Sequence, residues 1–290
     1  MPLRNGSDAW FLGDTFTGDV VDGHRTSFDM VHNAVGMETP DGHMHFECPQ
    51  GAEFQPTRSG EWYWPGYGLE VHGEVYMFAK AISNVPGPAG FSFQWDRSDL
   101  VEVRNPQAPP QQWQYSTRSV PGTPETGLYG TAGVRDGSWL YLYGITDGQA
   151  RVARTRAEKL PALHLSYWTG HAWSSQAQKA RPLFDGGATE MSVCKVPGRS
   201  GYYAVYTQDG VGRDIVMRHA EQPEGPWSDA QVVYRCPETG LFNYAAKAHP
   251  ELSSKDGELV VTYCCNPPDF NANVDPSLYR PRAIKLHIPQ

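Results

Sequence analysis

The sequence predicts an all-β fold, and within that class a five-bladed β-propeller whose antiparallel blades surround a central axis. Three observations lead to this prediction: the composition favours short strands and tight turns, one strand motif recurs five times, and a glycine turn precedes each copy. Together they indicate a series of small antiparallel sheets rather than a helical or mixed fold.

The composition favours strands and limits the classes of partner. The 290 residues include 9 Trp, 15 Tyr, 30 Gly and 24 Pro; aromatic residues suit strands, while Gly and Pro suit turns. A formal charge of −8 argues against nucleic acid or an anionic membrane as partner, because both require a basic face. The sequence has no apolar run of about 18 residues, so we expect no membrane span.

One strand motif recurs about every 60 residues, a period typical of a propeller with several strands in each blade. The copies read AWFLGDT, VYMFAKA, LYLYGIT, YAVYTQD and VVTYCCN, and they align on Leu12, Phe78, Tyr143, Tyr206 and Tyr263. Five copies fill the chain, so we predict a single propeller domain over residues 1–290. Further strands are expected over 150–156, 214–220 and 283–289.

Each copy follows a polar turn that contains glycine, and within each copy a small residue comes directly after the aligned position. The turns are Asn5-Gly6, His72-Gly73, Asp136-Gly137, Ser200-Gly201 and Asp256-Gly257. Asn-Gly and Asp-Gly pairs readily adopt the positive φ angles of a tight hairpin. The small residues are Gly13, Ala79, Gly144, Thr207 and Cys264. We interpret them as the places where blades converge and space is short.

The first blade has little sequence ahead of its repeat strand. Only nine residues precede Trp10, which leaves no room for an inner strand and its turn. This blade is therefore either incomplete or completed by a strand from elsewhere in the chain.

Two carboxylates are the candidates for catalysis, because the inner strands of a propeller direct polar side chains into a shared axial pocket. Asp14 lies in a Gly-Asp-Thr turn, where we expect it to remain ionised as base or nucleophile. Glu190 interrupts a small and apolar stretch, an environment in which a carboxyl group can act as a general acid. Glycoside hydrolysis requires two carboxylates in such different environments. The structural alternatives are a turn cap for Asp14 and an ion pair with arginine for Glu190.

Six further residues are candidates for substrate binding, because they lie just upstream of a repeat hairpin or in the strand after the first copy. They are His32, Asn33, Trp64, Tyr129, Lys247 and His249. Trp64, like its neighbour Trp62, could stack on a sugar face, although packing between blades is the commoner role of a tryptophan. His249 could bind an axial cation through water, or be a structural histidine whose ring is already hydrogen-bonded.

We expect no required cofactor, with a structural calcium ion or another axial cation near His249 as the alternative. The chain has five cysteines without any CxxC spacing: Cys48, Cys194, Cys236, Cys264 and Cys265. This pattern indicates ordinary reduced thiols rather than a zinc site.

Seven short motifs follow one another between Trp10 and Leu286: LGDTF, HNAVG, YWPGYG, EMSV, GPWS, AKAHPEL and YRPRAIKL. In this order they resemble a bacterial family of five-bladed propellers long labelled as of unknown function. Some of its members are assigned as endo-D-arabinanases that act on mycobacterial-type arabinan. The implied architecture is also similar to the arabinanase and β-xylosidase propellers, in which three axial carboxylates act as base, acid and pKa modulator.

The resemblance implies a role for three residues. Asp14 matches the acid of the family's Gly-Asp-Thr motif, Glu190 an axial glutamate, and His249 an axial histidine near a cation or water cluster. The sequence departs from the family in two places. It has no room for the inner strand and acidic residue that usually precede the Gly-Asp-Thr motif, and its third repeat has no carboxylate at the axial position.

We therefore predict a glycoside hydrolase-like enzyme that acts on a furanose-containing, arabinan-type glycan through Asp14 and Glu190. Two other hypotheses stay open: an intracellular propeller enzyme that tailors a small molecule in biosynthesis, and a carbohydrate-binding propeller without catalysis. In each case the partner is a carbohydrate or another small molecule, and no oligomeric state is indicated. Without a signal peptide we expect a cytoplasmic protein, or a secreted one if upstream residues were lost.

Overall fold

The computed structural model describes residues 1–47, 54–87 and 92–289. Within them the chain forms six sheets whose strand pairs are antiparallel, so the predicted all-β class is confirmed. The chain divides into two compact units. The first comprises Met1–Asp19 and Ser27–Pro124, and the second comprises Val20–Thr26 and Glu125–Gln290.

The first unit is built on two sheets. One has the order β1 (Asp8–Leu12), β4 (Ala34–Glu38), β5 (Met44–Glu47). The other has the order β6 (Glu61–Val71), β7 (Glu74–Asn84), β8 (Phe93–Val103), β9 (Tyr115–Ser119), with a 3-10 helix η2 (Pro110–Gln112) before β9. Between β1 and β4 the chain forms a hairpin of β2 (Thr15–Val21) and β3 (His24–Val31).

The second unit is built on three sheets. The first contains β10 (Leu128–Asp136), β11 (Trp139–Thr146), β12 (Gln149–Arg156), β13 (Ser166–Trp168), β14 (Trp173–Ser174) and β15 (Phe184–Asp185). The second contains β16 (Met191–Cys194), β17 (Tyr202–Thr207), β18 (Asp214–Ala220) and β19 (Gln231–Arg235). The third contains β20 (Phe242–His249), β21 (Glu258–Asn266) and β22 (Pro281–His287). Short 3-10 helices connect some strands: η3 (Ala157–Ala162), η4 (Ala177–Lys179), η5 (Pro250–Leu252) and η6 (Phe270–Val274).

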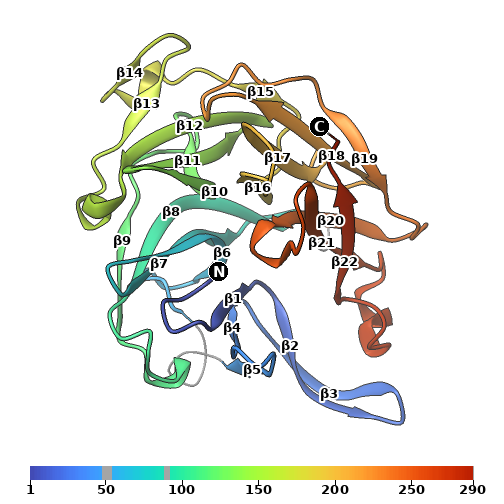
Figure 1. Ribbon diagram of the computed structural model, residues 1–290. Helices are drawn as coiled ribbons and strands as arrows, with labels where there is room; N and C mark the ends of the chain where they lie inside the picture. Colours follow the sequence, from blue (N-terminus) through green and yellow to red (C-terminus); the bar gives the residue numbers. More distant parts are fainter. Residues whose placement is uncertain (48–53, 88–91, 290) are drawn as a thin grey trace. The chain divides into compact units, whose positions relative to one another are not determined.

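The five repeat strands are β1, β7, β11, β17 and β21, and each belongs to a different sheet (Figure 1). Each is preceded by the predicted turn, whose glycine has a positive φ angle in every case. The values are 84° at Gly6, 89° at Gly73, 56° at Gly137, 73° at Gly201 and 76° at Gly257. Because residues other than glycine rarely adopt such angles, the turns explain why glycine recurs at these positions.

The sheets of each unit pack face to face. In the first unit a single buried cluster joins Val35 of β4 to Tyr63 of β6 and Met77 of β7. In the second unit one cluster joins the β10–β12 sheet to the β16–β18 sheet, and another joins that sheet to the third. Strand β17 is buried on both faces and contributes residues to both clusters, so a neighbouring sheet covers it on each side, as expected of stacked blades.

The small residue that follows each aligned position of the repeat has more than one cause. At Gly144 an added Cβ would lie 2.2 Å from the carbonyl oxygen of Leu128, so close backbone approach requires glycine there. At Gly13 an added Cβ would meet no heavy atom within 4 Å among the described residues beyond its chain neighbours. Crowding therefore explains Gly144 but not Gly13, and the sequence interpretation is corrected at Gly13.

Three strands at the start of a sheet carry a β-bulge. The register shifts between Pro65 and Gly68 in β6, between Tyr129 and Ala132 in β10, and between Tyr244 and Lys247 in β20. A bulge interrupts the alternation of side chains and re-aims those that follow it. Candidate site residues of both units lie in or beside these bulges.

Two other expectations concern cysteines and membrane spans. The four cysteines that the structure describes are free thiols, in agreement with the sequence, and Cys48 lies outside the described residues. Among the described helices we find none with the length and apolar character needed to cross a bilayer.

Candidate active site

Asp14 lies between β1 and β2, and two side chains donate hydrogen bonds to the same oxygen of its carboxylate. The indole Nε1 of Trp64 is 2.7 Å from Oδ1, and Nδ1 of His32 is 2.9 Å from it. An indole nitrogen can only donate, and a histidine nitrogen that faces an ionised carboxylate carries the hydrogen. No described residue donates a hydrogen bond to Oδ2, and the Asp14 side chain is 21% exposed. The carboxylate is thus held at one oxygen and accessible at the other.

Aromatic rings fix both donors. His32 stacks on Trp62, with ring centroids 4.7 Å apart and an interplanar angle of 24°. Trp64 meets Trp62 edge-on at 6.2 Å and Phe93 edge-on at 4.7 Å. We call Asp14, His32, Trp62, Trp64 and Phe93 the Asp14 cluster. The indole Nε1 of Trp62 is buried and has no hydrogen-bond partner among the described residues.

Asn33, which follows His32, is fully buried and bonded to backbone. Its Nδ2 donates to the carbonyl oxygens of Phe54 (3.2 Å) and Tyr63 (3.1 Å), and its Oδ1 accepts from the Phe54 nitrogen at 2.7 Å. Because Tyr63 lies between Trp62 and Trp64, this amide ties β6 to the residue next to His32. The contacts of Asn33 support a structural role at the cluster rather than contact with a ligand.

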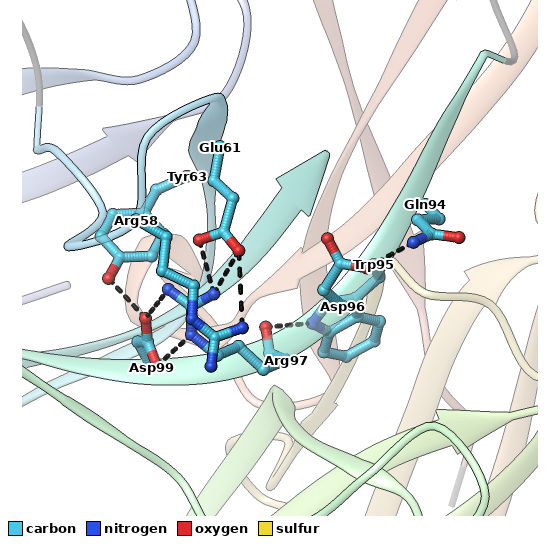
Figure 2. A network of polar contacts seen from close by, with 8 residues as sticks. All are labelled: Arg58, Glu61, Tyr63, Gln94, Trp95, Asp96, Arg97 and Asp99. Carbon is cyan, nitrogen blue, oxygen red and sulfur yellow. Dashed lines mark hydrogen bonds and ion pairs between the residues drawn. The ribbon is translucent and has the colours of Figure 1, made fainter. Parts of the chain in front are cut away.

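The opposite face of β6 carries a buried ion network, defined as Glu61, Tyr63, Arg97 and Asp99 (Figure 2). Alternation along the strand directs Glu61 and Tyr63 away from the face of Trp62 and Trp64. Arg97 donates to Glu61 at 2.6 Å and to both oxygens of Asp99 at 3.1 and 2.8 Å. The Tyr63 hydroxyl donates to Asp99 at 2.6 Å.

The network is buried and saturated. Side-chain exposure is 10% for Arg97, 8% for Glu61 and 3% for Asp99. Burial raises the pKa of Tyr63 well above its usual value, and the bond to Asp99 raises it further. Burial alone would lower the pKa of Arg97, but its bonds to Glu61 and Asp99 outweigh that effect and raise it.

Two alanines on β7 make this network possible. Ala81 pairs with Tyr63 on one side and Arg97 on the other, and Ala79 pairs with Pro65 and Asp99. Cross-strand partners project on the same face of a sheet. The methyl group of Ala81 therefore leaves the space in which Arg97 reaches from β8 to Glu61 on β6.

In the second unit, Glu190 lies directly before β16 and is partly exposed. The carbonyl of its neighbour Thr189 accepts from Thr131 of β10 at 3.2 Å, and Ser192 of β16 accepts from the Ala248 nitrogen of β20 at 3.0 Å. Burial raises the pKa of the Cys264 thiol to about 12, and the charge of Glu190 contributes to this shift. Glu190 is therefore close enough to Cys264 of β21 for its charge to act on the thiol.

His249 and Lys247 share one face of β20, where Lys247 pairs with Thr262 of β21 and His249 pairs with Val260. Nε2 of His249 is 2.8 Å from the Thr262 hydroxyl, and Nδ1 is 3.4 Å from a carboxylate oxygen of Glu251. Burial alone would raise the pKa of Glu251, but the hydrogen bond with His249 helps to lower it below its usual value. Both ring nitrogens of His249 are thus engaged by protein groups.

Tyr129, the remaining predicted residue, is fully buried on β10. Its ring lies 5.4 Å from that of Tyr167, and its hydroxyl donates to the Thr126 carbonyl at 3.3 Å. Burial raises its pKa well above the usual value. These contacts support a packing role.

Residues 1–47, 54–87 and 92–289 contain no group of at least three His, Cys, Asp or Glu side chains that could hold a metal ion. In the described part of the chain, a cation near His249 therefore has no such group of side chains to hold it. A cation held through water stays a hypothesis.

The sequence interpretation missed Lys80 on β7. Lys80 is 3% exposed and pairs with Trp64 on β6 and Ser98 on β8. It therefore belongs to the face of the sheet that carries Trp64. The signal was present in the motif VYMFAKA, where a lysine interrupts an otherwise apolar strand, because a buried lysine requires a specific environment.

Comparisons with known proteins agree with this architecture. Residues 1–287 match the family model described as a domain of unknown function, DUF5005. Notoamide biosynthesis cluster protein J of Aspergillus sp. (strain MF297-2) is 30% identical over 135 residues, which are 43% of this chain and 35% of that protein. The match thus spans about a third of the length of this curated relative.

Solved structures resemble nearly the whole chain. A Bacteroides ovatus ATCC 8483 protein assigned as a hydrolase superimposes with a TM-score of 0.81 at 19% identity, covering 99% of this chain and 84% of that one. A GH43 β-xylosidase/α-arabinofuranosidase from a compost microbial metagenome, in complex with xylotriose, gives 0.54 at 14% identity, with 100% and 96% covered. A GH43_1 enzyme of Xanthomonas citri, complexed with xylose, gives 0.52 at 17%, with 98% and 89% covered. These likenesses show the fold, which is the predicted five-bladed β-propeller.

Proposed function

This chain belongs to the DUF5005 family, and we propose that it is a glycoside hydrolase that acts on a pentose-containing glycan, with an arabinan-type furanose glycan as the first candidate. Its fold is shared with GH43 glycosidases. The single observation that carries the proposal is the Asp14 carboxylate, which is held at Oδ1 and accessible at Oδ2. The substrate class is supported by the xylotriose and xylose bound to two structural neighbours.

The proposal assigns different roles to two carboxyl groups. Asp14 acts as base or nucleophile at the anomeric carbon, because its unpaired oxygen can accept a proton from water or attack directly. Glu190 acts as general acid and protonates the leaving oxygen as the glycosidic bond breaks. Glu190 directly precedes β16, and Ser192 of β16 accepts a hydrogen bond from the Ala248 nitrogen, which lies between Lys247 and His249 on β20; this link supports a polar site in the second unit.

The test is to incubate the protein with arabinans, xylans and aryl glycosides and to measure released sugar. On a substrate that is turned over, E190Q is expected to lose activity toward the natural glycan but to retain much of it toward an aryl glycoside whose leaving group needs no proton. D14N is expected to lose both activities. D136N, a surface carboxylate paired with Lys195 in the second unit, serves as the control with wild-type rates. Full turnover of the natural glycan by E190Q would remove the acid role.

A second function has one observation in its favour. The curated relative is named for the notoamide biosynthesis cluster, which supports an enzyme that tailors a small molecule. That function would be favoured if no glycoside releases sugar and the protein converts an intermediate of a biosynthetic pathway whose genes lie beside its own gene. Binding of a glycan without release of sugar would favour the third hypothesis, a carbohydrate-binding propeller without catalysis.

The proposal requires no cofactor. A calcium ion held through water near His249 is the alternative. Turnover that is lost in a chelator and restored by Ca²⁺ would establish such an ion, whereas unchanged turnover in the chelator would exclude its requirement.

A further inference from the structure

We propose that His32 and Trp64 are positioning residues, which hold Asp14 by Oδ1 so that Oδ2 faces the reacting sugar. The inference rests on the proposed function in assigning Asp14 to catalysis. It goes beyond that function by naming the groups that make this aspartate competent, and it changes the role expected for His32 and Trp64 from substrate contact to orientation of the base.

The geometry of the two hydrogen bonds carries the first step. Rotation of a carboxyl group about its last bond is soft, because that torsion has broad wells. Donors at 2.7 and 2.9 Å on the same oxygen of Asp14 restrict the rotation and distinguish Oδ1 from Oδ2. If one donor had bonded each oxygen, both lone-pair sets would be engaged and the group would resemble a structural carboxylate.

The rigidity of the donors carries the second step. Trp62 supports His32 by stacking and contacts Trp64 edge-on, and Phe93 also contacts Trp64 edge-on. Asn33 pins the intervening residue of β6 to the segment that bears His32. Donors that are themselves locked by packing hold a reactive group more closely than donors on mobile side chains.

The contacts of Trp64 also argue against a simpler role, in which its indole ring stacks on a sugar of the substrate. Its Nε1 is used by Asp14, and rings lie against it from Trp62 and Phe93. The opposite assignment, in which Asp14 orients His32 as the acid–base group, follows the logic of a catalytic triad. It predicts that loss of His32 costs more than loss of Asp14, whereas the positioning role predicts the reverse.

The first experiment needs no substrate. Proton–nitrogen spectra of protein labelled at tryptophan report each indole N–H, and W64F identifies the resonance of Trp64. D14A removes the acceptor, so we expect the Trp64 resonance to move upfield. Trp10, whose indole donates to Glu38 at 3.0 Å in the same unit, is the matched control and should not move. An unshifted Trp64 resonance in D14A would show that Trp64 does not hold Asp14, and this would overturn the positioning role whatever the substrate is.

The second experiment separates hydrogen bonding from stacking. H32N keeps a nitrogen near the position of Nδ1 but loses the ring, whereas H32F keeps the ring but loses the donor. On a turned-over glycoside we expect H32F and W64F to lower kcat about 10- to 100-fold with little change in KM, and H32N to recover part of the loss. W10F should match the wild type.

The outcomes distinguish this inference from the proposed function. If no glycoside is turned over, the proposed function fails, while the indole resonance still decides whether Trp64 donates a hydrogen bond to Asp14. If turnover is found, an H32F rate equal to wild type, or a loss in H32F larger than in D14N, would overturn the positioning role.

Discussion

Each face of strand β6 carries donors that hold a carboxylate, but the donors differ and so does the number of carboxylate oxygens that they engage. On one face Trp64 and His32 bond a single oxygen of Asp14, whose side chain is 21% exposed. On the other face Arg97 bonds both oxygens of Asp99, to which Tyr63 also donates, and Asp99 is 3% exposed. One carboxylate keeps an oxygen for another molecule, and the other has none left.

The difference shows how the two faces of one strand can carry different groups, one that stabilises the fold and one that can react with a ligand. In a buried ion network whose groups are all paired, a substitution that leaves one charge unpaired destabilises the fold strongly, because no solvent can replace the lost partner. A carboxylate held at one oxygen costs the fold little when it is changed, since its partners reach solvent or other groups. We therefore expect substitutions on the Arg97 face to alter folding and substitutions on the Asp14 face to alter reactivity.

Removal of Arg97 should have the largest effect on stability. R97M leaves Asp99 buried without a cation and Glu61 with only the exposed Arg58 at 3.9 Å, and we expect the free energy of unfolding to fall by about 3–5 kcal/mol. Urea denaturation followed by circular dichroism measures this change. R104M is the matched control, because Arg104 pairs with Glu102 in the same sheet but is 57% exposed, and it should cost less than about 1 kcal/mol. Equal effects would contradict the distinction between buried and exposed pairs.

Filling the space beside Ala81 on β7 should have the next largest effect on stability. A81L places a branched side chain between Tyr63 and Arg97, its partners on β6 and β8. Overpacking a buried position typically costs about 1–3 kcal/mol, and here it also displaces the ion pair. Thermal unfolding would show the loss. A midpoint equal to that of the wild type would mean that Arg97 does not cross Ala81 to reach Glu61.

The pH dependence at the alkaline end tests Tyr63. Because its pKa is raised in the folded state, the folded protein keeps this proton above pH ~10, where the unfolded chain releases it. Stability from this group is complete below pH ~10 and falls as the pH rises, by at most about 1.4 kcal/mol per pH unit. Unfolding midpoints from pH 8 to 11 should therefore fall less steeply for Y63F than for the wild type. Parallel curves would contradict the shift.

The smallest effect is expected at the edge of the network. Arg58 lies 3.9 Å from Glu61 and is 68% exposed, so solvent screens the pair. R58A should change the free energy of unfolding by less than about 1 kcal/mol. A loss comparable to that of R97M, measured in the same denaturant series, would show that the network extends to the surface.

The repeats made the fold predictable because their signals are local. A glycine with positive φ precedes all five repeat strands, and each strand carries its own pattern of apolar residues. Packing of one sheet on the next follows from strands that are apolar on both faces. The same local signals did not explain Gly13, whose surroundings are open.

The candidate site was predictable in its members and not in its contacts. Asp14, His32 and Trp64 were each expected near a site, and the structure brings them together. Asn33 and Tyr129 were expected to bind substrate but are fully buried, because side-chain direction depends on bulges and tertiary packing that no spacing reveals. The Arg97 network was missed because its charges lie on two strands, β6 and β8, and pair across β7 between them.

The most direct test measures turnover per folded molecule for D14N and R97M, with the folded fraction of each preparation determined by circular dichroism. Asn keeps an acceptor oxygen at position 14, so we predict that D14N unfolds at the wild-type midpoint and loses about 10²- to 10⁴-fold in kcat. R97M is predicted to unfold earlier and to turn over at the wild-type rate while folded. Wild-type turnover by D14N, or an equal loss in R97M, would contradict the account.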